Sequence, residues 1–398
     1  MKALRQYKRM LAAFLLLSLL LLTGCGAVSP PAEEREAAPP AAEREAAPAL
    51  PLEQSLSAEK AAPEAEKDAR AEQPVKPKGK SYYTYFDTVS YVYDYAGDEE
   101  ELFDARCDQV SQILYDYHRL FDIYHEYSGV TNLCTLNKAA GGEPLEVDDR
   151  LIDFLLCARE MYTLTDGEMN VMLGPVLRLW HECREAASSD PAHAAIPTEE
   201  ELRSAAAHTG IELLEIDRER GTVRITDPEG SIDVGALGKG YATERAAEYL
   251  EAEGAWGYVL NIGGNIRCIG DRPNGSGWVT AVRDPDQSSE NFACRIRIRD
   301  TACVTSGVYE RYFTVDGTRY HHIIDIDSLY PADYFSSLTV ITRDSALADA
   351  LSTALFCMSE EEGRALTQKI GGVELLWIYP DGTQHSTPGF AALIENPS

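Results

Sequence analysis

Apolar residues recur at the 3.6-residue spacing of helices in some segments of the chain and alternate with polar residues in others. Helical spacing predicts five helices, over residues 100–124, 148–167, 198–210, 238–254 and 345–363. The second begins with an acidic turn and ends at Gly167, and the third begins with Thr198 followed by Glu201, which is the spacing of a capping box. The fourth is entered from a glycine-rich turn.

Strand patterns occupy most of the remaining chain. Strands are predicted within residues 82–96, 213–237 and 256–270, in the run that ends at Asp325, and within 372–382. The first segment alternates and is rich in Tyr and Val, so it predicts a strand pair or one long strand. Because strands and helices come in runs without regular βα alternation, we predict the α+β fold class.

The chain begins with a different pattern. Residues 1–24 open with basic side chains, continue as an apolar run and end in Leu-Thr-Gly before Cys25, which has the form of a bacterial lipoprotein signal. We expect removal of this signal peptide and lipid on Cys25; the alternative is a signal anchor that stays uncleaved. Two or more acyl chains would hold the protein on the cell membrane, at its extracytoplasmic face.

Residues 25–80 consist mainly of Ala, Glu and Pro, with a near repeat of the motif AAEREAAP. Such a segment has too little apolar surface to offset its chain entropy, so it is predicted to be a disordered tether. Its mean reach would be on the order of 40 Å. Residues 81–398 are therefore predicted to form the folded part, whose partner lies close to the membrane.

The charge balance narrows the possible partners. The chain has 36 Lys and Arg against 65 Asp and Glu, a formal net charge of −29. An acidic protein is poorly suited to nucleic acid, whose phosphates require a basic surface, and to broad contact with anionic lipid. Eight cysteines follow Cys25 without a CxxC pair or a zinc spacing. They could pair as disulfides, but several stand in apolar runs, which favours buried free thiols.

The segment Ser231–Leu250 contains more glycine than a helix start requires. Gly235, Gly238 and Gly240 permit close approach of the backbone to another group, and Asp233 and Lys239 flank the turn. The following helix start could hold a phosphate. A phosphate loop and a plain strand-to-helix turn both agree with these residues.

Two further stretches have a chemical and a structural interpretation each. The paired glycines of Asn261–Asn265 mark either a place where a ligand enters or a simple hairpin bend. Asp349 and Thr353 are four residues apart and share one face of a predicted apolar helix. A buried Asp needs a cation or a donor, so the pair could bind Mg²⁺ or form a side-chain contact.

Two adjacent histidines, His321 and His322, stand in a predicted strand that precedes Asp325, in a chain with only 8 histidines. Alternation turns neighbouring side chains of a strand to opposite faces, so one ring would face the core and the other water. Histidine is also the side chain most readily used for proton transfer near neutral pH. The local sequence leaves both roles open.

Together these stretches resemble one family, the FAD:protein FMN transferases, bacterial flavin transferases formerly called thiamine biosynthesis lipoproteins. The resemblance extends from about Tyr85 to Gly363. It rests on five motifs in the family's order: TDGEMNVMLGPVLRLW, DVGALGKGYATERA, NIGGN, TSGVYERYFTVDGTRYHHIID and DSALADALSTALF. It implies an FAD-binding domain over residues 81–398, with mixed, mainly antiparallel sheets and packed helices.

The resemblance also implies a reaction. FMN would be transferred from FAD to a Ser or Thr hydroxyl of an exported target protein, with release of AMP, in the presence of Mg²⁺. By resemblance, the metal ligands would be Asp349, Thr353 and the carbonyl of Ala236. The residues in contact with FAD would be Phe86, Glu168, Met169, Asn170, Asp233, Lys239 and His322.

His322 stands where the family has its catalytic histidine, which leaves His321 for the opposite face of the strand. The chain departs from the family at residues 325–329, Asp-Ile-Asp-Ser-Leu in place of Asp-Pro-x-Thr-Gly, and Asn170 replaces a common Asp. Two other functions share the same residues: an FAD pyrophosphatase that yields FMN and AMP, and a non-catalytic flavin-binding lipoprotein. The presence of both the metal pair and His322 favours catalysis.

Overall fold

The computed structural model describes residues 76–286 and 292–395. The predicted signal peptide, Cys25 and nearly all of the predicted tether lie outside these residues. The first strand, β1 (Lys78–Tyr85), begins within the last residues that were assigned to the tether. None of the helices within the described ranges is both long and apolar enough to cross a membrane.

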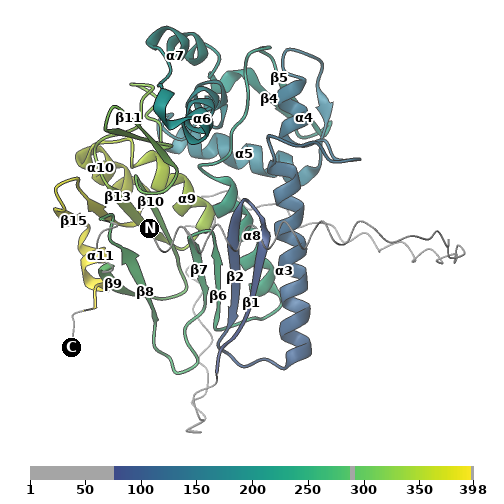
Figure 1. Cartoon of the computed structure of the whole chain (residues 1–398). Helices are drawn as coiled ribbons and strands as arrows, with labels where there is room; N and C mark the ends of the chain where they lie inside the picture. The colour runs from purple at the N-terminus through teal and green to yellow at the C-terminus, as the bar shows by residue number, and fades with distance from the viewer. Residues whose placement is uncertain (1–75, 287–291, 396–398) are drawn as a thin grey trace, which may run out of the picture. The chain divides into compact units, whose positions relative to one another are not determined.

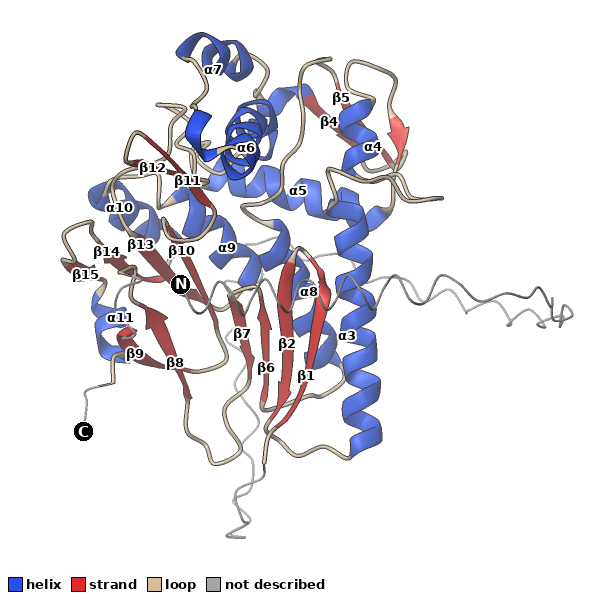
Figure 2. Cartoon of the chain, viewed as in Figure 1, coloured by secondary structure: helices blue, strands red, loops and turns tan. Residues whose placement is uncertain are grey.

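An eight-stranded sheet forms the centre of the fold (Figures 1 and 2). Its strand order is β1-β2-β6-β7-β10-β13-β14-β15, and every neighbouring pair is antiparallel. After β1 these strands are β2 (Thr88–Asp94), β6 (Tyr258–Ile262), β7 (Asn265–Ile269), β10 (Ala302–Gly307), β13 (Ser337–Thr342), β14 (Glu374–Ile378) and β15 (Gln384–Ser386). The prediction of α+β structure with mainly antiparallel sheets is confirmed.

Three helices cover one face of this sheet: α3 (Glu100–Phe121), α8 (Gly238–Ala252) and α9 (Ser345–Ala354). Their apolar faces and the sheet form the main core. On the opposite face, Trp278 and Ile296 of the hairpin β8 (Trp278–Arg283) and β9 (Phe292–Ile298) pack in a second cluster with Phe390 of α11 (Pro388–Leu393). Both faces of the central strands are therefore buried.

The remaining elements adjoin the helical layer (Figure 1). One group contains α4 (Leu133–Lys138), α5 (Asp149–Leu164) and the small sheet of β3 (Leu145–Glu146), β5 (Thr222–Ile225) and β4 (Leu214–Asp217). Another contains α6 (Gly174–Ser189), α7 (Glu199–Ala206) and the hairpin β11 (Tyr312–Val315) and β12 (Thr318–His321). Trp180, Phe313 and Ile324 belong to the apolar cluster of this second group.

Several local predictions are confirmed. Residues 82–96 form a strand pair, and Thr198 and Glu201 form the predicted capping box at the start of α7. The eight cysteines after Cys25 are free thiols, and five of them are buried. The single helix predicted over 345–363 is wrong, because α9 ends at Ala354 and α10 (Glu360–Ile370) begins at its own capping box of Ser359 and Glu362.

Candidate functional site

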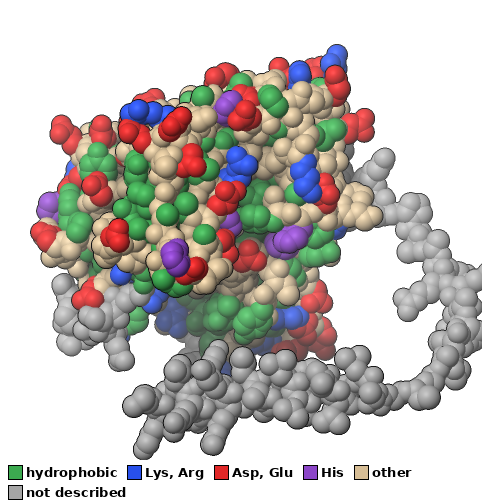
Figure 3. All heavy atoms as spheres, turned by 45° about the horizontal axis from the view of Figure 1, so that its top comes forward, with side chains coloured by type: hydrophobic (Ala, Val, Ile, Leu, Met, Phe, Trp, Pro, Cys, Tyr) green, Lys and Arg blue, Asp and Glu red, His purple; other side chains and the backbone are tan. Residues whose placement is uncertain are grey.

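A cavity of about 1210 Å³ lies where the group that contains α4 and α5 and the group that contains α6 and α7 meet the central sheet. Its wall is formed by the β1–β2 turn, α6, the loop before α8, the β6–β7 turn, strand β10, the segment after β12, and α9. This volume exceeds that of most small-ligand pockets, so a large cofactor fits. Figure 3 shows a face that is hollowed, with acidic, basic and histidine side chains around the hollow.

The structure brings nine of the predicted site residues to this cavity, although they are far apart in the sequence. They are Glu168, Met169, Asn170, Asp233, Ala236, Lys239, His322, Asp349 and Thr353. Each stands at the end of an element or in a loop, except Lys239 in the first turn of α8 and the pair on α9.

Phe86 is the predicted cofactor residue of the described chain that does not line the cavity. It lies in the β1–β2 turn with φ 54°, and its ring packs edge-on against the ring of His118, with centroids 5.8 Å apart. This backbone conformation directs the ring toward α3, and Asp87 and Thr88 line the cavity at this turn. No local pattern in the sequence indicates this left-handed turn, in which Phe86 and Asp87 both have positive φ.

The glycine-rich segment leads into the first turn of α8, where Gly238 and Gly240 pack against other parts of the protein. Gly240 packs so closely against α9 that a Cβ atom there would lie 2.4 Å from the backbone oxygen of Ser345. Its N–H donates to Oδ2 of Asp349 at 2.8 Å. Gly240 is thus required for the crossing of α8 and α9, whereas Lys239 beside it faces the cavity, with its Nζ 3.9 Å from Oδ2 of Asp349.

The paired glycines 263 and 264 form the two-residue turn between β6 and β7, both with positive φ, as the tight hairpin turn requires. The same turn lines the cavity together with Asn265. The hairpin interpretation is confirmed, and the entry of a ligand at this turn stays a prediction. Oδ1 of Asn265 is buried and has no hydrogen-bond partner among the described residues, and Asn265 also hydrogen-bonds the carboxylate of Asp349.

Asp349 is a carboxylate that is 5% exposed, on a helix face that borders the cavity. Burial raises its pKa, while Lys239 and the N–H of Gly240 act in the opposite direction. Thr353 presents its side chain one turn further along α9. A buried carboxylate beside a neutral oxygen and an unpaired amide oxygen fits a hard cation, which needs few protein ligands if phosphates and water supply the others.

Within residues 76–286 and 292–395, no group of three or more His, Cys, Asp or Glu side chains is arranged to hold a metal. A cation next to Asp349 would therefore take its other ligands from Thr353, from backbone such as the carbonyl of Ala236, and from the bound molecule. Mg²⁺ is commonly held in this way at phosphate sites.

The two histidines have different surroundings. His321 ends β12 and is 7% exposed; its Nε2 lies 2.8 Å from the carbonyl oxygen of Ala332, and its Nδ1 accepts the N–H of Ile323. Both ring nitrogens are thus used by backbone. His322 follows in a bend, and its ring is exposed to the cavity. The predicted division between a structural ring and an accessible ring agrees with this geometry.

The ring of His322 is reached by solvent through the cavity but is surrounded by protein walls. The surrounding walls lower its pKa below the usual value of 6.5, and the positive charge of Arg311 contributes in the same direction. The ring is therefore neutral at pH 7 and has a lone pair available to accept a proton.

Among the cations of this cavity, Lys239 is a predicted site residue, whereas Arg311, Arg184 and His181 are not. Arg311, Lys239 and Arg184 all act on the pKa of His322, and Arg311, Lys239 and His181 all lower that of Asp233, although burial as the largest effect raises it. These side chains thus converge on one region of the cavity wall. Residues 181 and 184 are three apart on α6, and Nη2 of Arg184 lies 2.6 Å from Nδ1 of His181.

Residues 325–329, which depart from the family pattern, still form a turn. Oδ1 of Asp325 accepts the N–H groups of Asp327 and Ser328, at 2.7 and 2.9 Å. Leu329 has φ 63°, a conformation that favours glycine, and its carbonyl oxygen accepts the indole N–H of Trp180 at 2.9 Å. The local contacts therefore hold the turn despite the substitution.

Glu168 lies in the cavity wall with its Oε2 buried and without a hydrogen-bond partner among the described residues. Burial, with the negative charges of Asp325 and Asp327, raises its pKa from 4.5 to about 7. Between these two values the folded protein retains a proton that the unfolded chain releases, so this group lowers the stability as the pH rises from about 4.5 to 7.

We expect Glu168→Gln to raise the free energy of unfolding by on the order of 1–3 kcal/mol at pH 8, because the amide needs no proton. The gain should shrink as the pH falls and disappear near pH 4.5. Urea unfolding at several pH values measures it, with Glu143→Gln, at an exposed side chain, as the control. A gain that is independent of pH would contradict the assigned titration.

Comparisons with known proteins identify the family of the chain. Residues 86–377 match the ApbE family. A protein of Klebsiella pneumoniae named FAD:protein FMN transferase is 29% identical over 69% of this chain and 82% of its own length. A Vibrio cholerae protein of the same name is 34% identical, over 61% of this chain and 71% of its own length.

Solved structures give the same result. The ApbE protein of Thermotoga maritima is 27% identical, with a TM-score of 0.70, over 81% of this chain and 100% of its own. The flavin transferase ApbE of Vibrio cholerae is 26% identical, with a TM-score of 0.66, over 80% and 100%. On the matched residues, the fold and the relatives together, the chain belongs to the ApbE family.

Proposed function

We propose that this protein transfers FMN from FAD to a Ser or Thr hydroxyl of an exported target protein and releases AMP, in a reaction that depends on Mg²⁺. The observation that carries the proposal is the shared position of Asp349, Lys239 and His322 in one large cavity. The names of the relatives support FAD as the FMN donor and a protein as the acceptor.

In the proposed reaction, the target hydroxyl oxygen attacks the phosphorus of the FMN half of FAD. The bond between this phosphorus and the bridging oxygen breaks, and AMP leaves with the electron pair. His322, neutral at pH 7, accepts the hydroxyl proton. Lys239 and Arg311 would stabilise the negative charge of the phosphates, whereas the carboxylates of the cavity wall would repel it.

The residues around Asp349 fit Mg²⁺, which would be held by Asp349, Thr353 and the carbonyl of Ala236. When bound, Mg²⁺ would neutralise charge on the phosphate oxygens. Asp233, whose Oδ1 accepts the N–H of Gly235 at 2.8 Å, would contact FAD and keep the turn before α8 in shape.

The function is tested by incubation of the protein with FAD, Mg²⁺ and candidate target proteins, followed by mass spectrometry of the target and assay of AMP. We expect the mass of FMN to be added to a Ser or Thr of the target, with one AMP per FMN. Free FMN and AMP without a target would indicate a pyrophosphatase instead. FAD binding without either product would indicate a carrier.

We also propose that the mature protein begins at Cys25 and is anchored in the cell membrane by lipid on this residue, facing outward. The signal pattern of residues 1–24 supports this location. We expect Cys25→Ser to move nearly all of the protein out of the lipid-modified membrane fraction, as measured by detergent partition and mass spectrometry of the N-terminus in the native host. A Cys25→Ser protein that partitions like the wild type would refute the anchor.

A further inference from the structure

The N-terminal ends of α8 and α9 are joined by two reciprocal hydrogen bonds. The N–H of Gly240 on α8 donates to Oδ2 of Asp349 on α9, at 2.8 Å. One turn further along α8, Oε2 of Glu244 accepts the N–H of Ser345, the first residue of α9, at 2.6 Å. Each carboxylate thus lies at the N-terminal turn of the other helix, where the helix dipole favours negative charge.

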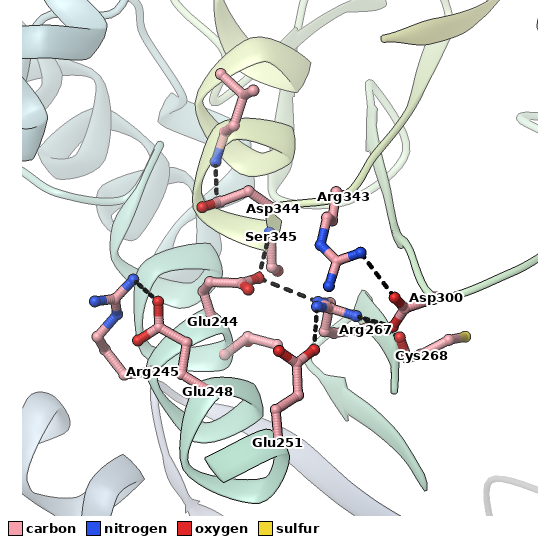
Figure 4. Close-up of polar contacts among 12 residues, drawn as sticks. Glu244, Arg245, Glu248, Glu251, Arg267, Cys268, Asp300, Arg343, Asp344 and Ser345 are labelled. Carbon is pink, nitrogen blue, oxygen red and sulfur yellow. Dashed lines mark hydrogen bonds and ion pairs between the residues drawn. The ribbon is translucent and has the colours of Figure 1, made fainter. Parts of the chain in front are cut away.

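Glu244 is held in turn by a charge cluster around the buried side chain of Arg267 (Figure 4). Arg267 of β7 is 1% exposed, and its Nε lies 3.3 Å from Oε2 of Glu244. Its Nη2 lies 2.7 Å from Oε1 of Glu251, and its Nη1 is 3.5 Å from Oδ1 of Asp300. Arg267 therefore fixes Glu244 from the side of the sheet, while Ser345 fixes it from the side of α9.

The two bonds act on the same face of α9. Ser345 and Asp349 are four residues apart, as are Gly240 and Glu244 on α8, so the two contacts are stacked one turn apart. The glycine brings the helix axes so close that movement of the α9 N-terminus would change the bond to Asp349. The bond between Glu244 and Ser345 therefore lies one turn from the bond that holds Asp349.

We propose that Glu244, held by Arg267, is a positioning residue that fixes the N-terminus of α9 and thereby the orientation of Asp349 toward a bound cation. The inference rests on the proposed function, because it assumes that Asp349 binds Mg²⁺. Glu244 itself does not line the cavity and is given no role in the chemistry.

The test compares Glu244→Ala with Glu251→Ala. Both remove a carboxylate from Arg267, but in this cluster only Glu244 bonds to α9. We expect Glu244→Ala to raise the half-saturating Mg²⁺ concentration for FMN transfer about tenfold or more, since loss of a group that orients a metal ligand costs roughly 10–100-fold in metal affinity. Turnover at saturating Mg²⁺ should change by less than about twofold, and Glu251→Ala should leave both values nearly unchanged.

A second readout needs no turnover. In protein without metal, hydrogen exchange of the amides in the first turn of α9 should be faster in Glu244→Ala than in Glu251→Ala or the wild type. Glu244→Gln should restore most of the Mg²⁺ affinity, because its amide oxygen can still accept the N–H of Ser345. Equal shifts in Glu244→Ala and Glu251→Ala, or an unchanged Mg²⁺ requirement in Glu244→Ala, would overturn the proposal.

Ser345→Pro removes the N–H that donates to Glu244, so this variant tests the same contact if Glu244→Ala does not fold. Proline is tolerated at the first position of a helix, and Asp344 before it is extended, as a residue before proline should be. This variant keeps the Glu244–Arg267 pair and should show the same rise in Mg²⁺ requirement; no rise would overturn the proposal. Failure of the proposed function is distinguishable, because the wild type would then transfer no FMN, and failure of the metal assignment would leave Asp349→Ala with a normal Mg²⁺ requirement.

Discussion

Asp349→Ala is expected to lower Mg²⁺-dependent FMN transfer by about 10³-fold or more and to leave the fold intact. The substitution removes the charged ligand from a site that has few others, and a bound metal contributes several kcal/mol of charge stabilisation. Initial rates over a range of Mg²⁺ concentrations measure the effect. Circular dichroism and thermal unfolding verify the fold.

Asp349→Asn is the matched control for this substitution. Its amide oxygen can still accept the N–H of Gly240, so the contact between the helices is kept while the charge is lost. We expect it to be nearly as inactive as Asp349→Ala. Because burial raises the pKa of Asp349, removal of this charge should not destabilise the protein without metal.

Thr353→Ala should have a smaller effect than either substitution, since a water molecule can replace a neutral hydroxyl ligand. Wild-type rates and an unchanged Mg²⁺ requirement in Asp349→Ala would refute the metal assignment. The burial of the Asp349 carboxylate, which is 5% exposed, would then need another explanation.

His322→Ala is expected to lower turnover by about 10²–10⁴-fold while FAD still binds, which is the usual effect of removing a positioned proton acceptor. The neutral ring faces the cavity, and among the described residues no backbone group hydrogen-bonds to it, whereas two hydrogen-bond to His321. Single-turnover AMP release measures the chemical step, and flavin fluorescence measures binding.

His321→Ala separates the two rings. This substitution leaves the carbonyl of Ala332 and the N–H of Ile323 without their partners and removes a ring that packs against Phe356. We expect the free energy of unfolding to fall by about 1–3 kcal/mol, with turnover of the folded protein reduced far less than in His322→Ala. Equal losses of turnover in both variants, or a loss only at His321, would show that the base is assigned to the wrong ring.

Some features of the fold could be predicted because their causes are local. Helix α3 follows from apolar spacing, α7 from the pair Thr198 and Glu201, and the β6–β7 hairpin from two glycines that accept positive φ. The break between α9 and α10 was also readable, since Ser359 and Glu362 have the spacing of a capping box. It was missed because the apolar spacing continues into this segment.

Most site residues were predicted from motifs, because a resemblance assigns each matching residue the position that its counterpart has in the family. Phe86 does not line the cavity, and it lies in a turn with positive φ values. Arg184, His181 and Arg311 were not identified, because a single Arg or His on a helix or loop has no distinctive local pattern. These cations differ from other surface charges in that they line the cavity, which the tertiary structure forms.

The sequence by itself determined many of the helices and strands, the order of the motifs and the identity of Asp349 and His322 as candidates. The tertiary structure alone decided that Gly240 meets α9, that Glu244 bonds to Ser345, and that His322 faces the cavity while His321 faces the core. Periodicity and capping depend on neighbours a few residues away, so they can be read along the chain. The crossing of two helices joins residues that are 109 positions apart in the sequence, and packing of the whole core fixes it.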